Sequence, residues 1–210
     1  MPRGTAALGP PFDDPVMLRT DGRRPGRAAL EALWRRRRDY LELRRPIVEE
    51  VCAQDVGPVA IPPAWVLALL WDELARRDLT EAASDWLLGR LGRDPSVGPY
   101  QVTGCTGLEV VGFVSWGAPY RRLRPAEMRD LLLDFTFATR IVVGRAQQIV
   151  SRWRTSGHDP WSEGGLGPHR VSPIALVGTL YSQGLGHPKP DPRPNPRGQQ
   201  IAAFAARLGT

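Results

Sequence analysis

Cysteine and histidine are scarce in this sequence, and neither is spaced as a metal site. Two cysteines, Cys52 and Cys105, stand among 210 residues. They are too few for a disulfide framework, so we expect two buried thiols rather than one disulfide. The three histidines, His158, His169 and His187, lie scattered over expected loops. Because the chain also lacks a phosphate-binding glycine loop and a dinucleotide pattern, it predicts neither a metal nor a cofactor.

Long hydrophobic runs are missing as well. No stretch approaches the roughly eighteen apolar residues of a membrane-spanning helix, so we expect no transmembrane segment. Residues 1–16 (MPRGTAALGPPFDDPV) have no apolar core after a basic start and do not read as a secretory signal peptide. We therefore expect a protein that is cytoplasmic as synthesised. To act outside the cell, it would leave by lysis or by a non-classical route.

Lysine is almost absent, although the formal net charge is +6. Lys189 is the only lysine, and the arginines are densest at Arg35–Arg38, with others at Arg121, Arg122 and Arg124. A basic surface attracts polyanions such as nucleic acid, anionic lipid headgroups or acidic wall polymers, and charge alone does not choose among them. A solvated helix face is the simpler interpretation of Arg35–Arg38. No helix-turn-helix spacing or aromatic RNA-binding motif accompanies these arginines, which disfavours nucleic acid.

Apolar periodicity predicts a mainly α-helical protein. Residues 1–26 are rich in proline, glycine and arginine without a hydrophobic period, and we expect a disordered or loosely attached leader there. Residues 27–210 are expected to form a single helical domain with long loops rich in glycine and proline. The predicted helices are 27–53 with a kink or break at Pro46, 64–77, a short one within 78–94, 125–154 as the longest, 173–182 and 198–208. The stretch 106–117 fits a strand or a helix equally well.

Glu73 is the main candidate for a catalytic group. It lies near the end of the helix predicted over 64–77, which is apolar on most sides and is expected in the core. Next to Trp71 and Leu70 its carboxyl group would be partly desolvated, which raises its pKa. A carboxylic acid that is neutral at about pH 6–7 can protonate a glycosidic oxygen. The simpler alternative is an ion pair with Arg76 or Arg77.

Two later segments carry polar groups that suit a glycan. Small residues in the turn 96–102 (SVGPYQV) allow a polymer to approach the backbone, and Gln101 can donate and accept hydrogen bonds to sugar amides. Tyr181, where an apolar helix ends at a glycine, would bond an acid across a cleft or serve as a core tyrosine. The candidate substrate-binding residues are Ser96, Gly98, Tyr100, Gln101 and Tyr181.

In this order the three segments resemble the lysozyme-like superfamily that contains the soluble lytic transglycosylases and goose-type lysozymes. In that family an apolar helix ends in the catalytic glutamate, as 68–73 (ALLWDE) does here. A Gly-x-x-Gln segment then lines the cleft, similar to 98–101 (GPYQ), and a Tyr-x-x-Gly closes a later helix, similar to 181–184 (YSQG). The resemblance covers roughly residues 62–184. The chain departs from the family at Leu74, where members usually have serine, and in its long spacer before Gly98.

The resemblance implies a lysozyme-like fold and a peptidoglycan-cleaving glycosidase or lytic transglycosylase. Its substrate would be a β-1,4-linked aminosugar polymer, with Glu73 as general acid and base. A transglycosylase needs no second carboxylate, whereas a hydrolase would use one to position water. Asp94 is the best candidate for that role, although stabilising the adjacent turn is the simpler role for it.

The alternative is a catalytically inactive lysozyme-like module, binding or structural, whose arginine-rich surface contacts a polyanion. The two hypotheses predict different surroundings for Glu73. Catalysis predicts an open groove with Gln101 and Tyr181 close to Glu73. An inactive module predicts an ion pair between Glu73 and an arginine, without a groove. We favour the enzyme.

Overall fold

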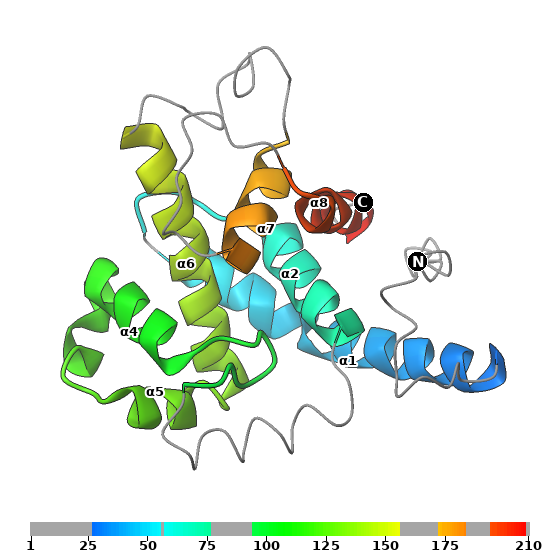
Figure 1. The fold of residues 1–210 in the computed structure, drawn as a ribbon, viewed down its shortest axis with the longest axis horizontal. Helices are drawn as coiled ribbons and strands as arrows, with labels where there is room; N and C mark the ends of the chain where they lie inside the picture. The colour runs from blue at the N-terminus through cyan, green and yellow to red at the C-terminus, as the bar shows by residue number, and fades with distance from the viewer. Residues whose placement is uncertain (1–26, 56, 77–93, 156–171, 184–193, 209–210) are drawn as a thin grey trace.

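The computed structural model describes residues 27–55, 57–76, 94–155, 172–183 and 194–208 (Figure 1). These residues are mainly helical, as the sequence predicts, and the only β-pairing among them is an isolated bridge between Val97 and Val102. The expected leader over 1–26, the short helix within 78–94 and the loops over 156–171 and 184–193 lie outside the described residues.

The first helix, α1 (Arg27–Gln54), continues through Pro46, so the expected break does not occur. Pro46 is exposed, whereas Val48 and Val51 just beyond it are buried in the core. Their burial holds the last turns of α1 in place although proline removes one backbone hydrogen bond. In Figure 1, α1 lies along the base of the molecule and its end passes beneath α2.

The second helix, α2 (Pro63–Arg76), lies in the core as predicted. Pro63 is its first residue, a position where proline removes no helical hydrogen bond. Six consecutive residues, Val66 to Trp71, are each at most 2% exposed, because α2 packs against α1 on one side and α8 on another. Polar side chains on a helix enclosed in this way need hydrogen-bond or ion-pair partners, because burying a polar group without a partner is costly.

The stretch that fitted a strand or a helix is helical: α4 (Gly104–Phe113) is followed by the short 3₁₀ helix η2 (Ser115–Tyr120). Thr103 caps α4, since its hydroxyl accepts a hydrogen bond from the backbone N–H of Thr106 at 3.1 Å. Position 104 has no room for a side chain, because a Cβ at Gly104 would lie 2.2 Å from the carbonyl oxygen of Pro125.

The prediction of a single long helix over 125–154 is wrong. Two helices, α5 (Pro125–Leu131) and α6 (Phe135–Thr155), occupy this stretch, and α1 with 28 residues is longer than α6 with 21. Asp134 starts the new helix, because its carboxylate accepts a hydrogen bond from the backbone N–H of Phe137 at 2.7 Å. Helix α6 then runs through the middle of the fold, in contact with α1, α2, α4 and α7 (Figure 1).

The last two helices are α7 (Pro173–Gln183) and α8 (Pro196–Leu208). They pack closely on each other, and α8 also packs against α2. A Cβ at Gly198 would lie only 2.1 Å from the carbonyl oxygen of Ala175, so glycine is required where α8 begins. This contact fixes the first turn of α8 beside the middle of α7.

Neither cysteine forms a disulfide. Cys52 is partly buried and Cys105 is exposed in the first turn of α4, so the expectation of two buried thiols is wrong for Cys105. Burial raises the pKa of the Cys52 thiol to about 12. No helix within the described residues is long and apolar enough to cross a membrane.

Candidate active site

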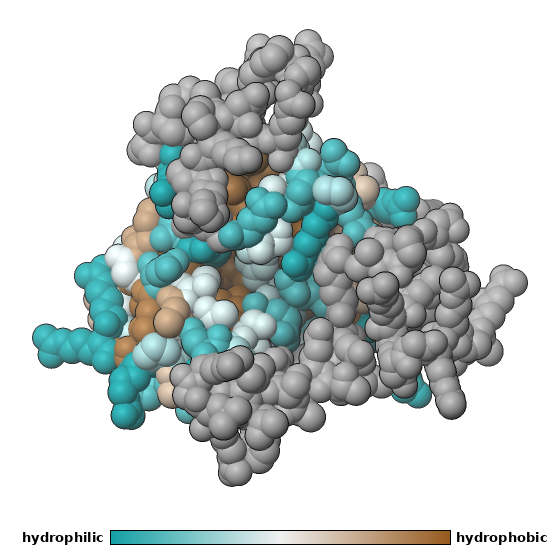
Figure 2. All heavy atoms as spheres, viewed as in Figure 1, coloured by the Kyte–Doolittle hydropathy of each residue, from teal (hydrophilic) through white to brown (hydrophobic). Residues whose placement is uncertain are grey.

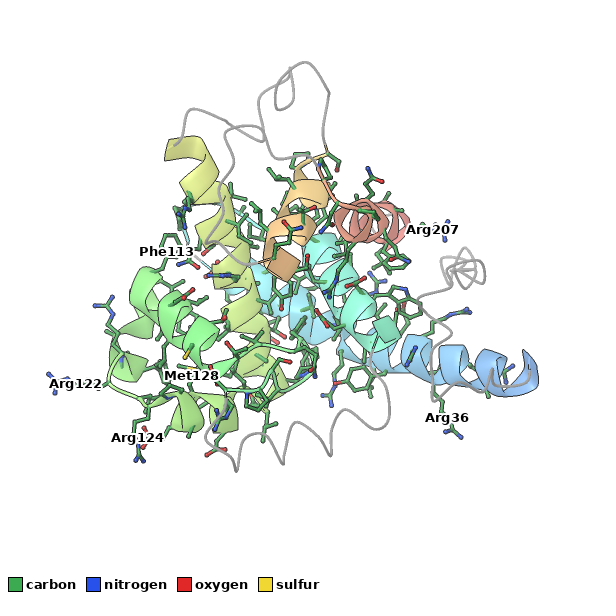
Figure 3. The ribbon with its side chains drawn as sticks, in the orientation of Figure 1. Arg36, Phe113, Arg122, Arg124, Met128 and Arg207 are labelled. Carbon is green, nitrogen blue, oxygen red and sulfur yellow. The ribbon has the colours of Figure 1, made fainter. Side chains whose placement is uncertain are left out.

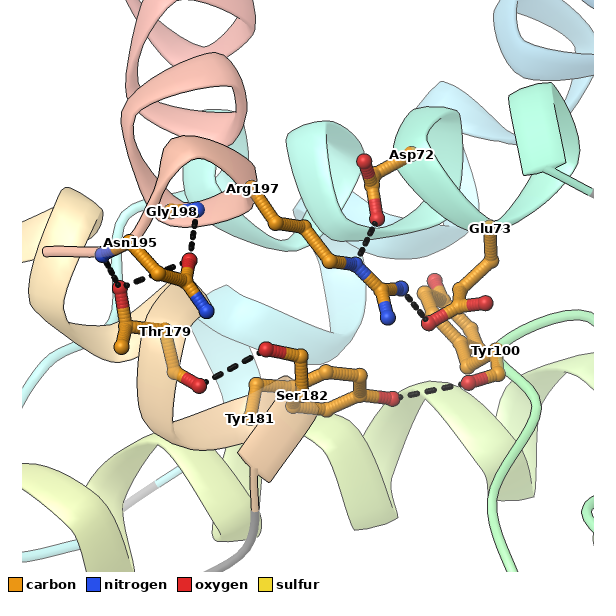
Figure 4. A network of polar contacts seen from close by, with 9 residues as sticks. All are labelled: Asp72, Glu73, Tyr100, Thr179, Tyr181, Ser182, Asn195, Arg197 and Gly198. Atoms are coloured by element: carbon orange, nitrogen blue, oxygen red, sulfur yellow. Dashed lines mark hydrogen bonds and ion pairs between the residues drawn. The ribbon is translucent and has the colours of Figure 1, made fainter. Parts of the chain in front are cut away.

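Three segments distant in the sequence meet beside the C-terminal half of α2 (Figure 4). Glu73 extends from α2 with its side chain 12% exposed. The hydroxyl of Tyr181, at the end of α7, donates a hydrogen bond to the backbone carbonyl of Tyr100 at 3.0 Å. This bond ties the end of α7 to the turn 96–102. The structure therefore brings the acid-bearing helix, the glycine-containing turn and the tyrosine into one region.

Tyr181 is held as a neutral hydrogen-bond donor. Its burial, followed by the negative charge of Glu73, raises the pKa of Tyr181 well above the ordinary value, although Arg197 and Arg145 act in the opposite direction. Tyr181 thus lies within electrostatic reach of both Glu73 and Arg145.

The turn 96–102 is closed by its own side chains. Gly98 has a φ of +73°, and a Cβ there would lie 2.2 Å from the carbonyl oxygen of Leu132. The amide nitrogen of Gln101 donates to the carbonyl of Gly98 at 3.0 Å, and the hydroxyl of Ser96 donates to the amide oxygen of Gln101 at 3.0 Å. Gln101 also has a φ of +50°. In this conformation the side-chain amide of Gln101 stabilises the turn. To bind a sugar amide, it would have to give up its hydrogen bonds to Gly98 and Ser96.

The side chain of Tyr100 points into the core. It is fully buried, its hydroxyl lies 3.1 Å from that of Thr139, and its ring packs against Phe135 with the centroids 5.8 Å apart. Only the backbone of Tyr100 faces the site. A role for its side chain in contacting substrate, as the sequence suggested, does not fit this placement.

Glu73 has a partner that the sequence analysis missed. A terminal nitrogen of Arg197, on α8, lies 2.5 Å from the carboxylate of Glu73, and the Nε of Arg197 lies 2.6 Å from that of Asp72 (Figure 4). Asp72 is buried, with its side chain 1% exposed. The expected ion pair with Arg76 or Arg77 involved neighbours on the same helix, and Arg77 lies outside the described residues. One signal was available: an arginine in the first turn of a helix opposes the helix dipole and needs a carboxylate nearby.

The start of α8 is fixed by a network that positions Arg197. The side chain of Asn195 accepts a hydrogen bond from the backbone N–H of Gly198 at 2.7 Å and so caps α8. The backbone N–H of Asn195 donates to the hydroxyl of Thr179 at 3.0 Å, and that hydroxyl donates to the carbonyl of Ala175 at 2.8 Å. Because Thr179 and Ala175 belong to α7, the first turn of α8 cannot shift without disturbing α7.

The charges of this cluster stabilise one another. Burial tends to lower the pKa of Arg197, but the carboxylates of Glu73 and Asp72 outweigh it and the net effect is to raise that pKa. The guanidinium group therefore stays charged, and its charge favours the ionised form of Glu73. Trp71 and Leu70 are buried next to Glu73 in sequence, as expected, and their desolvating effect is opposed by this ion pair.

A pocket of about 280 Å³ opens beside Tyr181. It is lined by Gln101, Val102, Thr103, Thr106, Ile141, Arg145, Tyr181, Ser182 and Gln183. Two of the predicted site residues, Gln101 and Tyr181, are among them, and Glu73 is not. Figure 2 shows the same face as Figure 1, with hydrophobic side chains visible between polar ones near the centre of the described surface.

Asp94 has a structural environment. Its carboxylate accepts hydrogen bonds from the backbone N–H groups of Gly104 at 3.0 Å and Cys105 at 2.8 Å, and from Arg129 at 3.0 Å. Burial acts to raise the pKa of Asp94, but the bonds from Cys105, Arg129 and Gly104 outweigh it and the pKa is lowered. Asp94 thus stabilises the start of α4 and joins it to α5, a structural role at a different place from the turn 96–102 where it was expected.

The arginine clusters do not form one surface. Figure 3 shows Arg36 on α1 at one end of the molecule, and Arg122 and Arg124 at the other end. Within Arg35–Arg38 the first two residues are exposed and the last two are partly buried. Arg37 donates to the backbone carbonyl of Ala75 at 3.0 Å, near the end of α2. Part of this cluster therefore joins two helices, and the solvated-face interpretation holds for its first half.

Comparisons of the chain with protein-family models, with curated proteins and with solved structures gave no significant match.

Proposed function

We propose that this protein cleaves a β-1,4-linked aminosugar polymer of the peptidoglycan class, with Glu73 as the acid. The observation that supports this most is the meeting of three segments. Tyr181 bonds the backbone of the turn 96–102, lies within electrostatic reach of Glu73, and lines a pocket together with Gln101. An acid, a cleft-lining glutamine and a tyrosine near the acid are the groups that a lysozyme-like site requires.

The reaction needs Glu73 in its protonated form, whereas the ion pair with Arg197 favours the carboxylate. In the proposed mechanism, the glycan draws Arg197 away from Glu73 on binding. The side chain of Arg197 is 26% exposed, so a bound glycan could contact it from the solvent side. Glu73 then lies beside buried apolar residues, where the neutral acid is favoured, and takes up a proton.

Bond cleavage follows from that proton. Glu73 donates it to the glycosidic oxygen, the bond to the leaving sugar breaks, and positive charge develops on the sugar ring that remains. The ionised Glu73 then accepts a proton from a hydroxyl of the same sugar, which closes an anhydro ring. The three donors that surround Asp94 favour this single-glutamate route, because they leave Asp94 poorly placed to act as a base for water.

The second candidate function is a binding module without catalysis, and one observation favours it. Arg197 holds Glu73 and the buried Asp72 together, as an inactive module predicts. In that case the pocket beside Tyr181 would bind a glycan that the protein does not cleave. The catalytic hypothesis predicted a groove that includes Glu73, and the pocket contains Gln101 and Tyr181 but not Glu73.

The test is release of soluble fragments from purified peptidoglycan by the wild-type protein and by Glu73→Gln, with the products identified by mass spectrometry. Glu50→Gln is the matched control, because Glu50 is exposed on α1 and bonds only Gln54 among the contacts seen here. We expect release by wild type and the control, with anhydro ends, and none by Glu73→Gln. Reducing ends would indicate a hydrolase. No release from walls of several chemical types by folded wild-type protein would favour the binding module.

A further inference from the structure

Arg145 is a buried cation that the proposed chemistry does not use. It lies on α6, its side chain is 7% exposed, and it lines the pocket beside Tyr181. A guanidinium group taken out of water is costly unless acceptors surround it. The positions of those acceptors therefore indicate what the pocket is built to hold.

The acceptors of Arg145 occupy only one of its three nitrogens. One terminal nitrogen donates to the carboxylate of Glu109 at 3.0 Å and to the side-chain oxygen of Gln148 at 2.7 Å. Within the described residues, its Nε and its other terminal nitrogen make no hydrogen bond. The side chain of Glu109 is 59% exposed, so its charge is largely screened by water and compensates Arg145 only in part.

The remaining walls of the pocket are neutral. No carboxylate is among its described lining residues, and Arg145 is the only charged one. The hydroxyl of Thr103 donates to that of Thr106 at 3.0 Å, which leaves the hydrogen of Thr106 for another acceptor. Val102 and Ile141 supply apolar surface. The pocket thus combines a partly compensated cation and hydroxyl donors with two aliphatic walls.

We propose that this pocket binds a carboxylate attached to a small aliphatic group. A doubly charged anion such as phosphate fits less well, because a single guanidinium group faces it. The backbone N–H groups that start α4, at Gly104 and Cys105, are already bound to Asp94. A volume of about 280 Å³ accommodates a substituent rather than a whole oligosaccharide.

This inference rests on the proposed function and narrows its substrate to a glycan that carries carboxylates. The carboxylate belongs either to an acidic sugar of the polymer or to a peptide attached to it. Tyr181 faces both the pocket and Glu73, so a carboxylate held by Arg145 would set which glycosidic bond lies at the acid. Arg145 is in this view a positioning residue and not a catalytic one.

Binding is measured by calorimetry on the wild-type protein, because none of the probes contains a glycosidic bond that could be cleaved. The probes are N-acetylmuramic acid, the dipeptide L-alanyl-D-glutamate, and N-acetylglucosamine as a sugar without a carboxylate. We expect one of the two carboxylate probes to bind, and Arg145→Gln to weaken that binding by about 10-fold or more, since a charge-assisted hydrogen bond is lost. Which probe binds identifies the source of the carboxylate. Equal binding of all three probes, or binding that Arg145→Gln leaves unchanged, would overturn the proposal.

Glu109→Gln provides a second test if Arg145→Gln does not fold. Glu109 is the carboxylate that competes for Arg145, and its exposure makes the substitution mild. The proposal predicts tighter binding of the carboxylate probe, by about 3- to 10-fold, whereas a purely structural Arg145 predicts no gain. Unchanged or weaker binding contradicts the proposal.

The two proposals fail separately. If the wild-type protein cleaves peptidoglycan but the Arg145 and Glu109 variants bind the probes unchanged, the proposed function stands and the proposed subsite is rejected. Carboxylate binding that depends on Arg145, in a protein that cleaves no wall polymer, retains the subsite and rejects the glycosidase.

Discussion

Glu73 and Asp94 are both carboxylates paired with an arginine, and they differ in what else holds them. Asp94 receives two backbone N–H groups from α4 in addition to Arg129. Glu73 pairs with Arg197, which also bonds Asp72. The carboxylate of Asp94 is bound by backbone N–H groups in the first turn of α4, which cannot move without the rest of that helix. The carboxylate of Glu73 pairs with a side chain that also bonds the neighbouring Asp72.

This difference makes Asp94 a structural carboxylate and is one reason for proposing Glu73, rather than Asp94, as the acid. Releasing Asp94 would leave the first N–H groups of α4 without an acceptor, which costs stability. Releasing Glu73 from Arg197 would break an ion pair between two side chains and would also disturb the pair of Arg197 with Asp72. The two ion pairs thus differ in whether backbone atoms also hold the carboxylate.

The largest expected effect is on activity. Glu73→Gln should lower the rate of glycan cleavage by a factor of about 100 to 10,000, the usual contribution of a general acid, whereas Asp94→Asn should leave the rate of the folded protein within a few-fold of wild type. The measurement is the initial rate of fragment release below the unfolding temperature of each variant. A comparable loss in Asp94→Asn would mean that Asp94 is a second catalytic carboxylate and would break the comparison.

The next effect is on stability, through the arginines. Arg197→Gln should reduce the free energy of unfolding by about 2–4 kcal/mol, because the buried Asp72 loses its ion pair with Arg197. Arg129→Gln should cost less, since Asp94 keeps its two backbone donors. Urea denaturation checks both, with the exposed Arg36→Gln as control. Adding Asp72→Asn to Arg197→Gln should recover part of the loss, and equal losses in the two arginine variants would contradict this reasoning.

A smaller effect is expected from the contact between α7 and α8. Gly198→Ala should destabilise the protein by about 1–3 kcal/mol, because its Cβ would lie 2.1 Å from the carbonyl oxygen of Ala175 and the helices must separate. Arg197 would move with α8, so activity should fall as well. Gly112→Ala is the control, since nothing lies within 4 Å of a Cβ there and alanine favours a helix. Thermal unfolding distinguishes the two, and equal midpoints would refute the close contact.

The smallest effect is a dependence of stability on pH. The lowered pKa of Asp94 means that folding stabilises its ionised form. This stabilisation is complete above the unfolded pKa of about 3.9 and is lost as the pH falls through the lower folded value. Wild type and Asp94→Asn should therefore differ at pH 6, and the difference should shrink as the pH falls below the unfolded pKa of about 3.9. The exposed Asp130→Asn serves as control, and a difference that persists in acid would argue against the pairing.

Much of the helical framework could be predicted from local sequence. Apolar periodicity located α2, α7 and α8 to within a few residues, because burial and helix geometry repeat on the same short scale. The split between α5 and α6 was missed, since the apolar pattern continues through it and only the capping role of Asp134 marks the new start. Tyr100 was placed on the substrate side, but the conformation of its turn directs the ring into the core.

The candidate site residues could be selected from the sequence, but the ion pair between Glu73 and Arg197 could not. The residues around Glu73, Gln101 and Tyr181 were selected by motif, and Tyr181 does bond the turn that contains Gln101. Arg197 lies 124 positions from Glu73, so no local pattern links them. Such a pairing depends on how α8 packs against α2 and α7, which short-range periodicity does not encode.

The ion pairs that Asp72 and Glu73 of α2 form with Arg197 become possible only late in synthesis. A ribosome delivers α2 long before α8, because synthesis runs from the N-terminus. Until residue 197 has left the exit tunnel, the carboxylates of Asp72 and Glu73 lack this counter-charge. We expect the nascent helix α2 to stay partly hydrated for most of translation, and its apolar face to be accessible to chaperones until α8 arrives.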